Sequence, residues 1–169
     1  YPSSFGHERF ENTENYNKKW MQGGYYLENK QAKDFELLYD CVDRNLLADY
    51  KDVLSSRPMK TELPMAIAEC GVVAYEFLLD FGSFRDLQRH RAIAQRMPLL
   101  VDYHGFNEWY LEALPEDLRE KTKKFIAEQE EKIKKLDISK EEKQYFLAMG
   151  YQVPCRFSGD LKALVYLAE

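Results

Sequence analysis

An apolar run at residues 71–80 constrains the fold of this 169-residue chain more than any other segment. The run is rich in β-branched and aromatic residues, and its length of about ten residues favours a strand over a helix. Gly82 and Ser83 follow it, and Ser83 is a suitable N-cap for a helix that extends to about Gln95. The sequence therefore predicts a strand that leads directly into a helix.

Most of the other predicted elements are helices. Residues 31–49 carry apolar side chains at steps of three and four, which is typical of a helix. Pro115 and the acidic residues after it begin the longest predicted helix. Ser139 and Glu142 form a capping box for another short helix. Residues 150–156 are predicted to be extended, which gives an α/β (α+β) fold with a mixed, largely antiparallel sheet flanked by helices and rich in helix.

Two long segments differ from this pattern. Residues 1–29 are polar and aromatic without a regular period, so we expect an arm that is largely extended at first. In the longest predicted helix, the charged run 128–135 is interpreted as a solvated face. The apolar stripe of the same helix is predicted to pack on the core; it comprises Leu118, Thr122, Phe125, Ile126, Ile133 and Leu136.

Composition restricts the classes of partner. The formal net charge of -5 argues against a nucleic-acid binder, because phosphate neutralisation needs a basic face. No apolar run has the roughly 18 residues of a membrane span, so no membrane partner is expected. The three cysteines form no CxxC motif, which favours reduced thiols and a cytoplasmic location. Their spacing from the three histidines matches no metal site, so no metal is predicted.

A cluster of cations lies just after the predicted strand in this otherwise acidic chain. Within twelve residues it contains Arg85, Arg89, His90, Arg91 and Arg96. A continuous helix would align three of these guanidinium groups on one face, where they suit the oxygens of a phosphate. The alternative is a set of surface ion pairs with neighbouring aspartates such as Asp80, Asp86 and Asp102. The spacing alone leaves both interpretations open.

Two stretches resemble a known family. Residues 84–91, which end in Arg89-His90-Arg91, together with the preceding residues 75–79, are similar to the signature of the flavin-dependent thymidylate synthases. Residues 153–168 resemble the late segment of the same family. The resemblance divides the chain into an N-terminal arm and helix at 1–57 and a thymidylate-synthase-like domain at 58–169. That domain is expected to be truncated at its C-terminus.

The resemblance implies a function. The expected reaction is methylene transfer from methylenetetrahydrofolate to dUMP, with a hydride from FAD and NADPH as the reductant. Arg89, His90 and Arg91 would bind the cofactor, while Arg85 and Arg89 would bind the substrate. The resemblance also implies a homo-oligomer, which in this family is a tetramer, or a tandem domain partner.

Departures from the family pattern leave the enzymatic status undecided. Leu99 replaces the expected Ser, Met97 the expected Glu and Val101 the expected Arg, so the nucleotide contacts are altered. The first hypothesis is a divergent enzyme of this family. The alternative is a non-catalytic domain that serves assembly or forms half of a tandem protein. A third possibility is a protein with a basic patch and no relation to the family.

Overall fold

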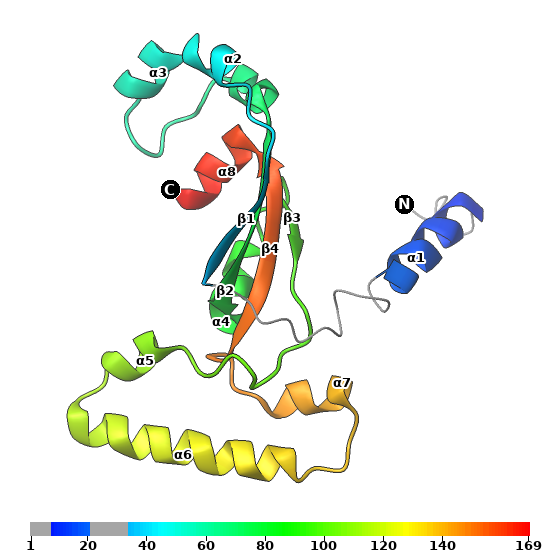
Figure 1. The fold of residues 1–169 in the computed structure, drawn as a ribbon, viewed down its shortest axis with the longest axis vertical. Helices are drawn as coiled ribbons and strands as arrows, with labels where there is room; N and C mark the ends of the chain where they lie inside the picture. The colour runs from blue at the N-terminus through cyan, green and yellow to red at the C-terminus, as the bar shows by residue number, and fades with distance from the viewer. Residues whose placement is uncertain (1–7, 21–33) are drawn as a thin grey trace.

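An antiparallel sheet organises the computed structural model, which describes residues 8–20 and 34–169 (Figure 1). Within these residues the strands are β1 (Phe35–Asp40), β2 (Val72–Asp80), β3 (Ala94–Arg96) and β4 (Gln152–Asp160). Their order is β1-β2-β4-β3, and every neighbouring pair is antiparallel. The predicted α+β class, with a largely antiparallel sheet and abundant helix, is confirmed.

Helices connect and flank these strands. The α-helices are α1 (Glu8–Trp20), α2 (Arg44–Ala48), α3 (Lys51–Ser56), α4 (Phe81–Leu87), α5 (Glu108–Glu112), α6 (Glu116–Lys134), α7 (Lys140–Lys143) and α8 (Leu161–Ala168). In the described part of the chain, the 3₁₀-helices η3 (Met65–Cys70) and η4 (Gln144–Phe146) precede β2 and β4 respectively. Figure 1 shows α2 and α3 near one end of the sheet and α5, α6 and α7 at the other. No helix in the described part of the chain is long and apolar enough to cross a membrane.

The two central strands have the same design. β2 and β4 each contain nine residues, pair along their whole length, and end in an aspartate that caps the next helix. Asp80 accepts a hydrogen bond from the backbone N–H of Ser83 at 2.9 Å, and Asp160 accepts one from Ala163 at 2.8 Å. An aspartate at this position satisfies an N–H group that the first helical turn leaves without a partner. Each strand therefore passes directly into a helix.

One face of the sheet carries the main core. Val153, Cys155 and Phe157 of β4 have no exposed surface, and Phe84 of α4 packs beside them. The ring of Phe77 meets that of Phe157 edge to face, with 5.2 Å between the ring centres. Complete burial of a side chain such as Val or Phe contributes about 1.5–3 kcal/mol, so this cluster fixes α4 on the sheet.

Several local predictions were wrong. Residues 35–40 form strand β1 rather than part of a helix, because they pair with β2 at the sheet edge. The helix after β2 ends at Leu87 instead of continuing to Gln95, and its N-cap is Asp80 rather than Ser83. Residues 8–20 form helix α1 within the predicted extended arm, whose other residues, 1–7 and 21–29, lie outside the described residues.

The predicted packing of α6 also needs correction. Leu118 and Phe125 are exposed, by 45% and 60% respectively. The half-buried side of the helix instead includes Thr122, Ile126 and Ile133. The helix contributes no fully buried residue, so it lies against the rest of the fold with one shallow face.

Other predictions are confirmed. β2 and α6 begin within a residue of the expected positions, and Ser139 and Glu142 form the predicted capping box. Strand β4 at Gln152–Asp160 contains most of the segment 150–156 that was predicted to be extended. The predicted domain boundary at residue 57 stays a prediction, although β1 from the first segment pairs with β2 from the second.

Candidate functional site

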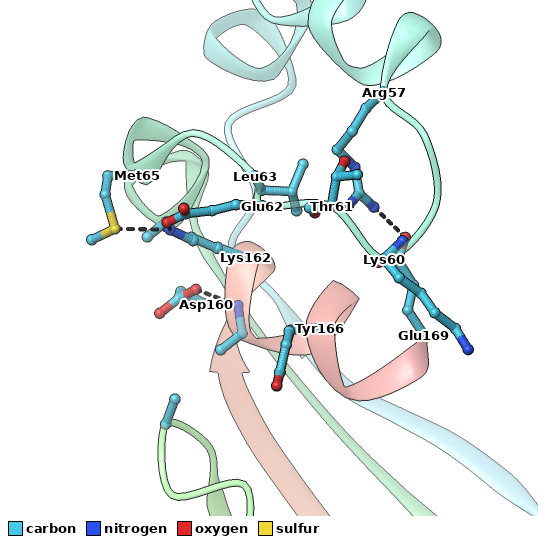
Figure 2. A pocket seen from close by; sticks show the side chains of 13 residues that line it. Arg57, Lys60, Thr61, Glu62, Leu63, Met65, Asp160, Lys162, Tyr166 and Glu169 are labelled. Atoms are coloured by element: carbon cyan, nitrogen blue, oxygen red, sulfur yellow. Dashed lines mark hydrogen bonds and ion pairs between the residues drawn. The ribbon is translucent and has the colours of Figure 1, made fainter.

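A pocket of about 510 Å³ lies between the segment 57–65, helix η3 and helix α8 (Figure 2). Its volume is within the range of about 300–1,000 Å³ that is typical of sites for small molecules. Pairing of β2 with β4 places η3, which precedes β2, beside α8, which follows β4. The two walls of the pocket are therefore about a hundred residues apart in the sequence but adjacent in the fold.

The wall of the pocket is mostly apolar. Leu63 is buried at its base, while Met65 of η3 is 71% exposed. Three small side chains, Ala68, Ala92 and Ala163, complete the apolar lining and leave the space open. An apolar lining of this kind favours a ligand with a flat hydrocarbon or aromatic body.

Ion pairs lie at the two ends of the pocket, as Figure 2 shows. At one end Lys162 contacts Met65 Sδ at 2.9 Å and Glu62 Oε1 at 3.4 Å. At the other end Arg57 donates hydrogen bonds to Glu169 and to the backbone carbonyl of Thr61. Because Arg57 and Glu169 have only 11% and 18% of their side-chain surface exposed, this pair holds the C-terminal end of α8 against the 57–61 segment.

Lys60 and Tyr166 lie at the mouth of the pocket. Lys60 is exposed and has a positive φ of 61°, a conformation that is uncommon outside glycine and asparagine. Its backbone N–H donates to Glu169 Oε2 at 3.2 Å, which holds the segment in this conformation. Tyr166 is 72% exposed, and its ring meets that of His90 edge to face at 5.6 Å between centres.

The structure distributes the predicted cation cluster over α4, the turn after it and β3, so the cluster does not lie along one helix. Arg89, His90 and Arg91 follow the end of α4, and Arg96 belongs to β3, so the predicted single face of guanidinium groups is wrong. Arg89 instead forms an exposed ion pair with Asp86 at 3.6 Å. Arg85, also exposed, has Nη1 3.3 Å from Met149 Sδ.

The turn nevertheless brings part of the cluster to the pocket. His90 contacts Tyr166, and Ala92, two residues later, lines the pocket wall. Arg91 lies between them and is exposed. The roles predicted for Arg85, Arg89, His90 and Arg91 in binding a cofactor or substrate stay predictions, because no ligand contact tests them.

A buried carboxylate lies on the other side of the molecule from this pocket, at the far end of β2. Asp80 is 2% exposed and accepts four hydrogen bonds: from the N–H and hydroxyl of Ser83, from Asn107 and from Tyr110, at 2.8–3.2 Å. Burial alone would raise the pKa of Asp80, but these hydrogen bonds outweigh it and hold the pKa below its usual value. The carboxylate joins the start of α4 to the segment that begins α5.

A row of charges crosses the sheet on one line of the register. Glu36 is paired with Glu76, Glu76 with Arg156, and Arg156 with Arg96, so two acids are followed by two arginines. Glu76 is 7% exposed, and its Oε2 lies 3.1 Å from Nη2 of Arg156. A buried carboxylate of this kind needs a charged or hydrogen-bonding partner, and Arg156 provides it. The sequence signal was a single acid inside the apolar strand, and it did not reveal the partner.

The cysteines do not form a reactive site. Burial raises the pKa of Cys155 to about 12 and also raises the pKa of Cys70. Both thiols are buried, while Cys41 is exposed, and all three are free. Among the described residues no cluster of His, Cys, Asp or Glu is arranged to hold a metal ion.

The chain is similar to parts of larger proteins. It is 31% identical over 102 residues to a UPF0159 protein of Chlamydia pneumoniae, covering 60% of this chain and 19% of that protein. A UPF0159 protein of Chlamydia muridarum is 26% identical over 152 residues, covering 85% and 27% respectively. UPF0159 protein Ta1429 of Thermoplasma acidophilum is 32% identical over 127 residues, covering 73% and 25%. The chain thus spans about a fifth to a quarter of the length of these relatives.

These comparisons correct the family assignment made from the sequence. No family model matches the chain, and the relatives carry the name UPF0159 rather than flavin-dependent thymidylate synthase. The prediction of a flavin-dependent thymidylate synthase is therefore wrong. The same holds for the predicted synthesis of thymidylate from dUMP and folate and for the alternative of a degenerate synthase domain. The expectation of FAD with NADPH depended on that resemblance alone and stays an untested prediction. Within the comparisons, the chain is similar to one part of the UPF0159 proteins.

Proposed function

We propose that this domain binds a small organic anion that has a flat apolar body, in the pocket between residues 57–65 and α8. The observation that carries the proposal is the combination of an apolar lining with the exposed Lys60 at the mouth of the same 510 Å³ pocket. Burial of the ligand body against Leu63, Met65 and the three alanines provides the binding free energy.

The charges around the mouth favour an anion over a cation. Arg57 and Lys162 already face carboxylates, so they balance the acids of the lining rather than attract a ligand. Among the described residues, no ion pair is seen for the side chain of Lys60 or Arg91. Lys60 lines the pocket and is exposed, and Arg91 is exposed next to Ala92, which lines the pocket. A carboxylate, sulfonate or phosphate group at the mouth would face Lys60 while the ring enters the pocket.

A fluorescent anion of this shape tests the proposal. The probe is 1-anilinonaphthalene-8-sulfonate, which combines an aromatic body with one sulfonate. Ala92→Phe should fill the pocket mouth and weaken probe binding at least tenfold, because the exposed alanine lines the wall. Lys60→Asn keeps a residue that tolerates positive φ but removes the charge, and should weaken binding about two- to fivefold.

Matched substitutions outside the pocket provide the controls. Ala113→Phe adds the same ring at an exposed position after α5, and Lys51→Asn removes a charge from α3. Both should leave the affinity unchanged, and circular dichroism should show the same fold in all variants. Equal affinities for all four variants, or no saturable binding by the unmodified chain, would contradict the proposed site.

We also propose a cytoplasmic location for the protein. The support is chemical: three free thiols, two of them buried in the core, are compatible with a reducing compartment. Recovery of the protein from cells with all three cysteines reduced, measured by alkylation under denaturing conditions and mass spectrometry, would agree with this. A native disulfide in that sample would contradict it.

A further inference from the structure

The solvent face of α6 carries a regular row of charges. Along one side of the 19-residue helix, at spacings of three and four, lie Asp117, Lys121, Lys124, Glu128, Glu131 and Lys135, the last being the residue that caps its C-terminus. All six are exposed, and Figure 1 shows α6 at the lower edge of the molecule with no described element beyond it. The opposite side contains the half-buried Thr122, Ile126 and Ile133, so the charged row points away from the fold.

The signs in this row have an unusual symmetry. Asp117 and Lys135 lie nine residues on either side of Ile126, and they carry opposite charges. Lys121 and Glu131 lie five residues on either side of Ile126 and are also opposite in charge. Lys124 and Glu128, two residues away on either side, repeat the pattern. Reversal of the helix about its midpoint therefore changes every sign in the row.

This symmetry makes the helix complementary to a reversed copy of itself. In an antiparallel pair with a twofold axis near Ile126, each acid of one helix lies at the level of a base on the other. In a parallel pair the like charges would meet instead, so the row also selects the orientation. Because the interface is isologous, each of the three opposite-charge pairs occurs twice.

An apolar side chain flanks the charged row near the proposed axis. Phe125 lies one residue from the midpoint and is 60% exposed, and at about 100° per residue it is on the edge of the face that carries the row. A shallow groove runs along the second half of the helix beside Ala127, between Lys124, Glu128 and Lys132. The small side chain allows close approach of a second helix at the usual distance of about 8–10 Å between axes.

We propose that a second copy of this chain docks on α6, with the two α6 helices antiparallel about a twofold axis near Ile126. Ion pairs within α6, such as Lys121 with Asp117 at 3.9 Å and Lys134 with Glu131 at 3.2 Å, are solvent-exposed and individually weak. They therefore do not prevent these side chains from pairing with charges on the second helix. An interface dominated by exposed charges is expected to be weak and sensitive to salt.

Charge reversal provides a test with an internal rescue. Variant one carries Lys121→Glu and Lys124→Glu, and variant two carries Glu128→Lys and Glu131→Lys. Each alone places like charges opposite each other at the interface, and the dimer dissociation constant measured by sedimentation velocity should rise at least tenfold. When the two variants are mixed, every altered lysine faces an altered glutamate, and the heterodimer should form as tightly as the wild-type dimer.

The controls separate pairing by α6 from general charge effects. Lys51→Glu with Lys140→Glu changes the net charge as variant one does, but at exposed positions outside α6, and should leave dimerisation unchanged. The wild-type dimer should weaken when the salt concentration rises to about 0.5 M, since the Debye length then falls below about 5 Å. A wild-type monomer at high protein concentration and low salt would overturn the proposal. Failure of the mixed variants to form a heterodimer would overturn it as well.

Discussion

Replacement of Asp80 by alanine should destabilise the fold far more than the same change at Asp160. Both aspartates end a nine-residue strand and cap the next helix, so loss of the cap costs about 1 kcal/mol at either site. Asp80 also accepts hydrogen bonds from Asn107 and Tyr110, and each donor left without a partner adds about 1 kcal/mol. The expected losses are therefore about 3 kcal/mol for Asp80→Ala and about 1 kcal/mol for Asp160→Ala.

An exchange of side chains tests whether these hydrogen bonds carry the effect. In Asp80→Asn one oxygen remains to accept from Ser83 N–H and Tyr110, but the new amide would face the amide of Asn107, at a cost of about 1–2 kcal/mol. Adding Asn107→Asp restores a donor–acceptor pair, and it keeps an acceptor for the N–H of Trp109 at the start of α5. Urea denaturation followed by circular dichroism would measure the free energies of unfolding of the wild type and the four variants. Equal losses for the two alanine variants, or no recovery in the exchange variant, would refute this explanation.

The pH dependence of the same variants has a definite sign. The pKa of Asp80 is lower in the folded chain than its usual value near about 3.9 in an unfolded chain. The ionised carboxylate therefore stabilises the fold fully above that value, and this stabilisation is lost as the pH falls through the folded pKa. The difference in unfolding free energy between wild type and Asp80→Asn should be constant between about pH 5 and about pH 7, and it should shrink below about pH 4.

Two further predictions concern backbone and thiol chemistry. Gly71→Ala should cost more than about 3 kcal/mol, because φ is 137° and the new Cβ would lie 2.3 Å from the carbonyl oxygen of Cys41. Gly105→Ala, at φ 77° but in open space, should cost only about 1 kcal/mol, and thermal unfolding would show a smaller decrease in Tm. Iodoacetamide at pH 8, in the folded protein, should modify Cys41 before Cys70 and Cys155, because both buried thiols have raised pKa values. Peptide mass spectrometry after short exposure gives the order, and early labelling of Cys155 would contradict it.

Local sequence patterns predicted the elements in which propensity and packing agree. Strand β2 combines β-branched residues with a central position in the sheet, and α6 begins at Pro115 with two acids in its first turn. β1 was missed because the spacing of Phe35 and its apolar neighbours fits a helix, while its pairing with β2 is a long-range property. Helix α4 ends early because of side-chain hydrogen bonds within the turn that follows it. The amide of Gln95 donates to the carbonyls of Leu87 and His90, and these two hydrogen bonds, eight and five residues apart in the sequence, stabilise a turn where the sequence allows a helix.

Only part of the candidate site could be predicted from the sequence. The cation cluster was visible in the sequence, but its arrangement depended on where α4 ends. The pocket was not predicted, because Leu63 and Tyr166 are about a hundred residues apart and meet only through the pairing of β2 with β4. The short motifs also did not identify the family correctly, because the longer alignments match UPF0159 proteins.

The most direct test of the proposed pocket is methyl NMR of the alanines during titration with 1-anilinonaphthalene-8-sulfonate. Ala68, Ala92 and Ala163 line the pocket, whereas Ala74 is buried in the sheet and Ala127 lies on α6. The proposal predicts that the first three methyl signals shift along one saturable curve, while those of Ala74 and Ala127 stay in place. Shifts centred on Ala127, or spread evenly over all five methyl groups, would contradict binding in this pocket.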